Sequence, residues 1–168
     1  LPSERDVGDA LSAACRIASR FVWVRHPSFD EMDYVASVGG KLFWTDWPGN
    51  HTCLLPVDRL VALGREAGAK EVIVKPVDRI WGTDHPSVLP LDAPSHQTAP
   101  YPAPLYDPLV YGPKPSVEFD RPVWAAFDVV FILGDGTVEL TYPSDPETTQ
   151  KRPTMTWVPT STENDKFL

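Results

Sequence analysis

Residues 127–142 read FDVVFILGDGTVELTY, and they carry the strongest local fold signal in the chain. The first seven residues are mostly β-formers that are apolar on both faces, which predicts a central strand. Residues 137–142 alternate polar with apolar side chains, which predicts a strand with one solvent-exposed face. Because the glycines of Gly134-Asp135-Gly136 tolerate positive φ angles, we expect a β-hairpin turn between the two strands.

Helix signals dominate the residues near the N-terminus. Ser3 is a candidate N-cap, acidic residues follow it, and apolar residues recur at helical spacing as far as Val22. This pattern predicts an amphipathic helix over residues 4–22, which Pro27 keeps from extending further.

Two shorter helices and three strands are expected between and beyond these segments. Ser28 and Glu31 have capping-box spacing, which predicts a second helix that ends at the Gly39-Gly40 pair. Pro56 suits the first turn of a third helix, for which Gly68 supplies the end. Strand composition is found in three further segments: residues 41–45, 71–74 and 154–158.

A proline-rich stretch separates the two halves of the chain. Residues 86–122 hold 10 of the 19 prolines. Proline lacks a backbone N–H and blocks both helix and central strand, so we expect a loop throughout this stretch. A loop of this length is either a mobile insertion or a segment ordered against the core. We favour the ordered segment, because Tyr101, Tyr106 and Tyr111 lie among the prolines.

These expectations define an α+β fold. The 168 residues fit a single domain, residues 1–168, which is long enough to bury a core without a disulfide or metal. We expect N-terminal helices packed on a mainly antiparallel sheet, with the long Pro-rich loop of residues 86–122 before a C-terminal β-hairpin.

The charge of the chain limits the partners that it attracts. The formal net charge is -8, which repels phosphate and anionic lipid and attracts cations, so we expect neither nucleic acid nor membrane as a ligand. Residues 83–168 hold 5 basic and 12 acidic side chains, whereas residues 1–82 hold 10 and 11. The acidic half favours a basic protein partner or serves solubility alone.

The cysteine count and the hydropathy of the chain bear on its location. Cys15 and Cys53 allow one disulfide at most, and we expect both to be reduced thiols. The sequence has no run of about 18 apolar residues and no signal-peptide pattern at its start. These features predict a cytoplasmic protein.

Local catalytic and cofactor motifs are missing from the sequence. It contains no phosphate-binding Gly-rich loop, no GxGxxG, no HExxH, no paired CxxC and no GxSxG. We therefore predict no cofactor and no metal site, although a catalytic triad assembled from distant residues has no local signature.

The nearest approach to a catalytic set is formed by Cys53, Asp84 and His85. A thiol, an imidazole and a carboxylate together suffice as nucleophile, base and orienting group. His51 with the same residues offers metal-ligand atoms, but the spacing matches no zinc pattern. The alternative, which we prefer, is a turn histidine, a buried thiol and a loop Asp-His-Pro.

Aromatic and acidic residues supply candidate binding positions instead. Aromatic rings anchor many protein interfaces, and carboxylates speed the encounter with a basic partner. The binding candidates are Trp47, Tyr101, Tyr106, Asp107, Tyr111, Glu118 and Asp120. For the tyrosines, fastening of the Pro-rich loop to the core is the competing interpretation.

Three functions are compatible with these observations. The first is a non-catalytic binding module that acts as an acidic inhibitor of a basic partner. In size, acidity and composition, the chain is similar to bacterial immunity proteins, which inhibit toxins. The second is a hydrolase or toxin catalytic domain that uses Cys53 or His85. The third is a structural module whose Pro-rich segment docks on a neighbour in a larger assembly. We favour the binding module.

Overall fold

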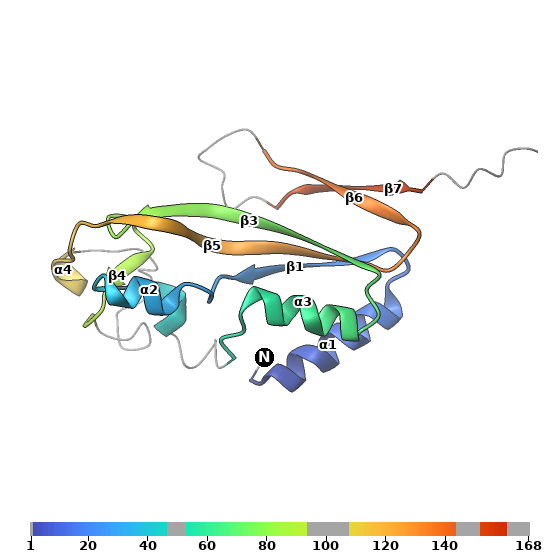
Figure 1. Ribbon diagram of the computed structural model, residues 1–168, viewed down its shortest axis with the longest axis horizontal. Helices are drawn as coiled ribbons and strands as arrows, with labels where there is room; N and C mark the ends of the chain where they lie inside the picture. Colours follow the sequence, from blue (N-terminus) through green and yellow to red (C-terminus); the bar gives the residue numbers. More distant parts are fainter. Residues whose placement is uncertain (1, 47–52, 94–107, 144–151, 161–168) are drawn as a thin grey trace, which may run out of the picture.

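A three-stranded antiparallel sheet forms the centre of the protein (Figure 1). The computed structural model describes residues 2–46, 53–93, 108–143 and 152–160. The strand order is β1 (Phe21–Pro27), β5 (Glu118–Ile132), β3 (Glu71–Gly82). The apolar run of residues 127–132 therefore lies in the central strand, as its composition predicts.

Two different layers cover the two faces of this sheet. The helices α1 (Glu4–Ile17) and α3 (Val57–Glu66) lie on one face, and the ribbon of β6 (Gly136–Thr141) and β7 (Thr154–Pro159) lies on the other (Figure 1). Alternate residues of β5 serve the two interfaces, since Phe131 packs with Leu11 and Leu60 of the helices and Val130 packs with Val138 of the ribbon. Burial on both faces gives the sheet two cores.

Short elements gather at the end of the sheet farther from α1. These are α2 (Met32–Ser37), β2 (Gly40–Leu42), the 3-10 helix η1 (Phe43–Asp46), β4 (Val88–Pro90) and α4 (Pro108–Tyr111) (Figure 1). Strands β2 and β4 pair antiparallel. Val35 of α2 and Ile80 of β3 are fully buried in one cluster, which attaches this end to the sheet.

The α+β class with a mainly antiparallel sheet is confirmed. Two helix ends are also found where glycine predicts them. Gly39 follows α2 with a φ of +84°, and Gly68 follows α3 with a φ of +101°. The strand expected at residues 154–158 is β7.

The predicted β-hairpin is wrong. Strand β5 pairs with β1 and β3, whereas β6 pairs with β7 and with no other described strand, so residues 133–135 carry the chain from one sheet to the other. The glycines are not at positive φ either, because the described glycines with positive φ are 39, 68 and 112. Gly136 is needed for space instead, since a Cβ there would lie 2.5 Å from both Trp157 Cζ2 and the Val158 carbonyl oxygen.

The first helix ends earlier than its periodicity predicts. It stops at Ile17, and residues 21–27 form β1. The run Phe21-Val22-Trp23-Val24 consists of aromatic and β-branched residues, which favour strands. Their pairing with the central strand β5 outweighs the helical spacing of the apolar residues. Pro27 is tolerated because β1 lies at a sheet edge.

The predicted capping box is also wrong, because Glu31 caps α2 without a side-chain hydrogen bond. Ser28 is buried, and its carbonyl oxygen accepts from Trp44 Nε1 at 2.7 Å. The strand expected at residues 41–45 is shorter than predicted, since β2 ends at Leu42 and η1 follows.

The Pro-rich stretch is not loop throughout. Within residues 86–122, β4, α4 and the first part of β5 are regular structure. Pro122 lies in β5 where the register with β3 shifts between Ile80 and Gly82, and β1 reaches only as far as Ala126. A proline is tolerated here because the strand has an irregular partner on one side and none in the described chain on the other.

Candidate functional site

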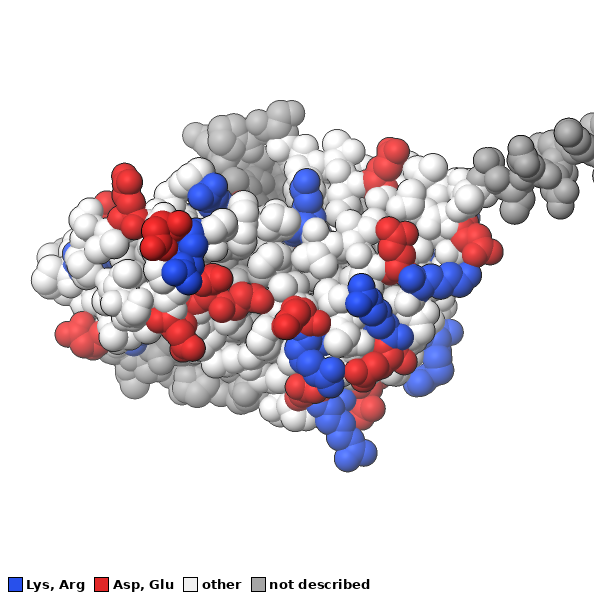
Figure 2. Space-filling view, in the orientation of Figure 1, with Lys and Arg blue, Asp and Glu red and all other residues white. Residues whose placement is uncertain are grey.

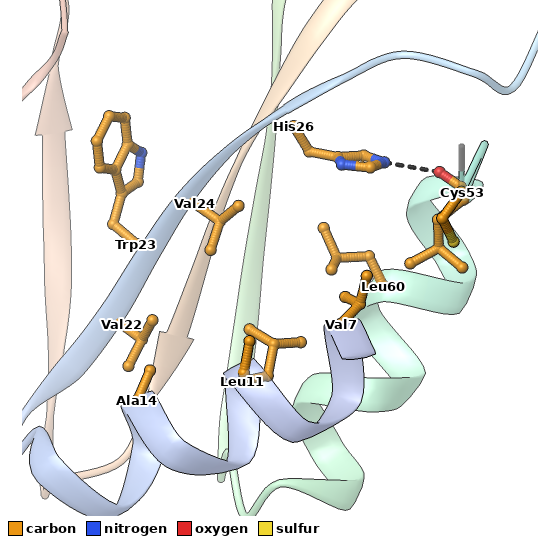
Figure 3. A pocket seen from close by; sticks show the side chains of 11 residues that line it. Val7, Leu11, Ala14, Val22, Trp23, Val24, His26, Cys53 and Leu60 are labelled. Atoms are coloured by element: carbon orange, nitrogen blue, oxygen red, sulfur yellow. Dashed lines mark hydrogen bonds between the residues drawn. The ribbon is translucent and has the colours of Figure 1, made fainter. Parts of the chain in front are cut away.

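The residues of the predicted catalytic set line different pockets. Cys53 lines an apolar pocket between α1 and β1, at the same end as His26 (Figure 3). Asp84 and His85 line a separate pocket at the far end of β3. The described structure therefore does not assemble Cys53, Asp84 and His85 into a nucleophile, base and orienting group.

Several predicted binding residues lie outside the described chain. These are His51 of the metal-ligand alternative and four candidates for partner binding: Trp47, Tyr101, Tyr106 and Asp107.

Tyr111 is described, and its role as an exposed anchor is wrong. It is 5% exposed and packs with Leu89 and Ala93 beneath α4. In the described part of the Pro-rich stretch, its ring fastens α4 to the core, which is the competing interpretation of these tyrosines.

Glu118, Asp84 and His85 meet in one surface pocket. We call it the Trp81 pocket, with a volume of about 230 Å³ and a lining of Trp81, Gly82, Asp84, His85, Val117 and Glu118. Asp84 and His85 of the predicted catalytic set thus lie in the same pocket as Glu118, a candidate for partner binding.

The frame of the Trp81 pocket is a tight crossing of two backbone segments. The Thr83 N–H donates to the Val117 carbonyl, and the Val117 N–H donates to Thr83 Oγ1 at 2.8 Å. Gly82 permits this approach, since a Cβ there would lie 2.5 Å from the Val117 oxygen. With Thr83 fully buried, this frame holds the pocket residues in fixed positions.

The Arg79 guanidinium lies close to the rings of both Trp81 and Trp124 and holds Trp81 in place. The Arg79 guanidinium lies 3.7 Å from the ring centroid of Trp81 and 6.0 Å from that of Trp124. These cation–π contacts fix one face of the Trp81 indole. The residue nevertheless remains 64% exposed, which is unusual for so large an apolar side chain.

His85 is held as a neutral imidazole in this pocket. Burial first, and the Lys114 ammonium second, lower the pKa of His85 below its usual value. The Ser87 N–H donates to His85 Nδ1 at 3.1 Å, so the proton of the neutral ring lies on Nε2. His85 therefore adds a hydrogen-bond donor but no charge at neutral pH.

The remaining polar contacts of the pocket leave the carboxylates of Asp84 and Glu118 able to accept further hydrogen bonds. Lys114 Nζ donates to the carbonyl oxygens of His85 and Val88 at 2.9 and 2.8 Å. Asp84 accepts from the Ser116 hydroxyl at 2.8 Å and keeps further acceptor capacity. Glu118 begins β5 and is exposed.

Among the described residues of 83–168, several acidic side chains are buried or already paired, so they do not form one continuous acidic surface. Asp128 is fully buried and bonded to Arg25, Asp135 pairs with Lys70, and Asp120 pairs with Arg121. Figure 2 shows acidic and basic side chains interspersed over the face in view. The candidate Asp120 is thus exposed but already paired, and it accepts a side-chain hydrogen bond from Tyr34 that helps lower its pKa.

The side chains of the Trp81 pocket can offer hydrogen bonds and cation–π contact to a ligand. The pocket offers one exposed indole, two carboxylates and a histidine N–H, and Lys and Arg side chains are the groups that carboxylates and indole faces attract together. Within the described residues, no group of three or more His, Cys, Asp or Glu side chains is arranged to hold a metal ion. Nor does any described helix have the length and apolar character needed to cross a membrane.

Sequence reasoning missed Trp81 and Arg79 as functional candidates. Tryptophan side chains are mostly buried on average, and nothing in a single sequence shows that Trp81 projects outward. The available signal was Arg79-x-Trp81-Gly82, in which alternate residues of a strand put a cation and an indole on one face.

In comparisons with known proteins, this chain matched no protein-family model, no curated protein and no solved structure.

Proposed function

We propose that this protein is a non-catalytic binding module for a basic protein partner, and that the Trp81 pocket is its contact site. An acidic inhibitor of a basic toxin, as in bacterial immunity proteins, is the specific form of the proposal. The observation that carries it is the exposed Trp81 ring beside the Asp84 and Glu118 carboxylates. Tryptophan is the residue most enriched in interface hot spots.

The fixed geometry of the site supports this role. Side chains that are already ordered lose little conformational entropy when a partner binds. Arg79 holds one face of Trp81, and the crossing at Thr83 and Val117 holds the loop beneath it. Because Trp81 is 64% exposed, a partner can contact the exposed part of the indole at a low entropic cost.

The charge of the chain supports a basic partner. A net charge of -8 speeds the encounter with a cation, and the two carboxylates of the pocket supply acceptors for a Lys or Arg side chain. Arg79 and Lys114 lie near the same site, so we expect the partner's cation to approach the Asp84 and Glu118 side of the ring. We place the interaction in the cytoplasm because both cysteines are free thiols.

Photo-cross-linking in the native host tests the proposal. A benzoylphenylalanine at position 81 should capture one basic protein, identified by mass spectrometry. Ile17 is the matched control position, because this apolar residue at the end of α1 is even more exposed. Equal capture at positions 81 and 17, or capture at 81 of acidic proteins only, would contradict the proposal.

A further inference from the structure

An apolar cavity lies on the opposite side of the sheet from the β6–β7 ribbon. It has a volume of about 430 Å³ and opens between α1, β1 and α3 (Figure 3). Most of its wall is aliphatic: Val7, Leu11 and Ala14 from α1, Val22 and Val24 from β1, and Leu60 from α3. This volume falls within the range of about 300–1,000 Å³ that is usual for small-molecule sites.

The cavity has one polar end. His26 and Cys53 lie at that end, whereas Ala14 and Val22 lie at the other (Figure 3). His26 Nε2 is 2.6 Å from the Leu55 carbonyl oxygen. Because a carbonyl only accepts, Nε2 must carry a proton.

The state of the His26 ring follows from its surroundings. Burial lowers the pKa of His26, so the ring is neutral at pH 7 and Nδ1 is an acceptor. No hydrogen bond within the described chain occupies Nδ1. Neither a lysine nor an arginine is among the residues that line the cavity.

We propose that this cavity binds a small, uncharged and mostly apolar molecule with one hydrogen-bond donor, whose hydroxyl or N–H meets His26 and whose apolar part lies along α1. An anionic ligand lacks a counter-ion here and is repelled by the net charge of -8. A cationic ligand finds no carboxylate on the wall.

The cavity is a pocket that is partly open to solvent, not a closed void in the core. Small-molecule sites are usually apolar pockets of this kind that are largely formed before the ligand binds. The wall is formed by elements that pack on each other, since α1 and α3 share one core cluster with β5. The binding site is therefore formed before the ligand arrives.

A pair of fluorescent probes tests the charge and polarity of the ligand. N-phenyl-1-naphthylamine is uncharged and has one N–H, and 8-anilino-1-naphthalenesulfonate has the same rings with an added sulfonate. We expect saturable 1:1 binding of the first probe and at least tenfold weaker binding of the second. We also expect 1-decanol to displace the bound probe and decanoate to fail.

Two alanines of α1 provide matched variants. Ala14→Trp fills the cavity and should weaken probe binding at least tenfold, whereas Ala13→Trp places the same side chain at the neighbouring residue, which does not line it. Melting temperatures of both variants verify folding, and Ala14→Leu replaces Ala14→Trp if the latter unfolds. The proposal is overturned by absent saturable binding, by equal affinities of wild type and the Ala14 variants, or by anionic compounds that bind as well as neutral ones.

Discussion

Replacement of Asp128 by asparagine should strongly destabilise the fold. The side chain is fully buried between the central sheet and the β6–β7 ribbon. Its two oxygens accept from Trp23 Nε1 at 3.1 Å, from Arg25 Nε and Nη2 at 2.9 and 2.8 Å, and from the Tyr142 hydroxyl at 2.7 Å. Asparagine keeps one acceptor oxygen and turns the other into an NH₂ group that faces a donor.

The magnitude follows from the charge that remains. Arg25 keeps only 23% of its side chain exposed, and it would lose its ion pair with the Asp128 carboxylate. Removing one partner of a buried ion pair costs about 3–5 kcal/mol, and total stabilities of domains are about 5–15 kcal/mol. For a chain of this length, about 3 kcal/mol corresponds to a fall in melting temperature of about 6–12 °C.

Urea denaturation followed by circular dichroism measures this loss. Asp135→Asn is the matched control, because the Lys70–Asp135 pair is exposed and should leave the urea midpoint unchanged. A loss below about 1 kcal/mol in Asp128→Asn, or equal effects of the two variants, would refute the stabilising role of the buried network.

Three further predictions concern glycine packing and pH. Gly64→Ala should lower the free energy of unfolding by about 1–3 kcal/mol, because the new Cβ would lie 1.9 Å from Phe131 Cε1. Gly8→Ala, where the nearest atom would be 3.5 Å from the new Cβ, should raise it by about 0.5–1 kcal/mol. Urea midpoints that move in the same direction in both variants would contradict this prediction. Burial and the Asp128 hydrogen bond raise the pKa of Tyr142, so stability should fall as pH rises above about 10, and less so in Tyr142→Phe; identical pH profiles would argue against it. Burial lowers the pKa of His26, so the unfolded chain binds a proton on this imidazole at a pH where the folded chain does not. Stability should therefore fall as the pH drops below about 6.5, and this dependence on pH should be weaker in His26→Phe.

The elements that the sequence predicts correctly are those with a local cause. The central strand is apolar on both faces whatever its partners, and Gly68 ends α3 because its φ of +101° favours glycine. The partner of β6 has no local signal, since β7 is separated from it in sequence and their contact depends on Val138 and Trp157 packing over Ile132. Turn chemistry at residues 134–136 therefore predicted the wrong partner.

The candidate site was predictable in part for the same reason. Asp84 and His85 are adjacent in the sequence, and Glu118 was noted among the acidic candidates. Their convergence depends on the register shift between β3 and β5 and on the close approach at Gly82, which are properties of the folded chain. For Tyr111 the sequence leaves a partner contact and a core contact open, because a tyrosine in a Pro-rich segment has the same sequence signature whether it is buried or exposed.

The proposed function is tested most directly by the association and dissociation rates between this protein and the partner that photo-cross-linking identifies. We predict that Trp81→Ala raises the dissociation rate about thirtyfold, the equivalent of about 2 kcal/mol, and leaves the association rate nearly unchanged. Asp84→Asn with Glu118→Gln should slow association, and raising the salt from about 0.1 to 1 M should reduce this difference. Ile17→Ala is the exposed apolar control and should change neither rate. Dissociation that is equally slow in Trp81→Ala and Ile17→Ala would contradict the assignment of the Trp81 pocket as the partner-binding site.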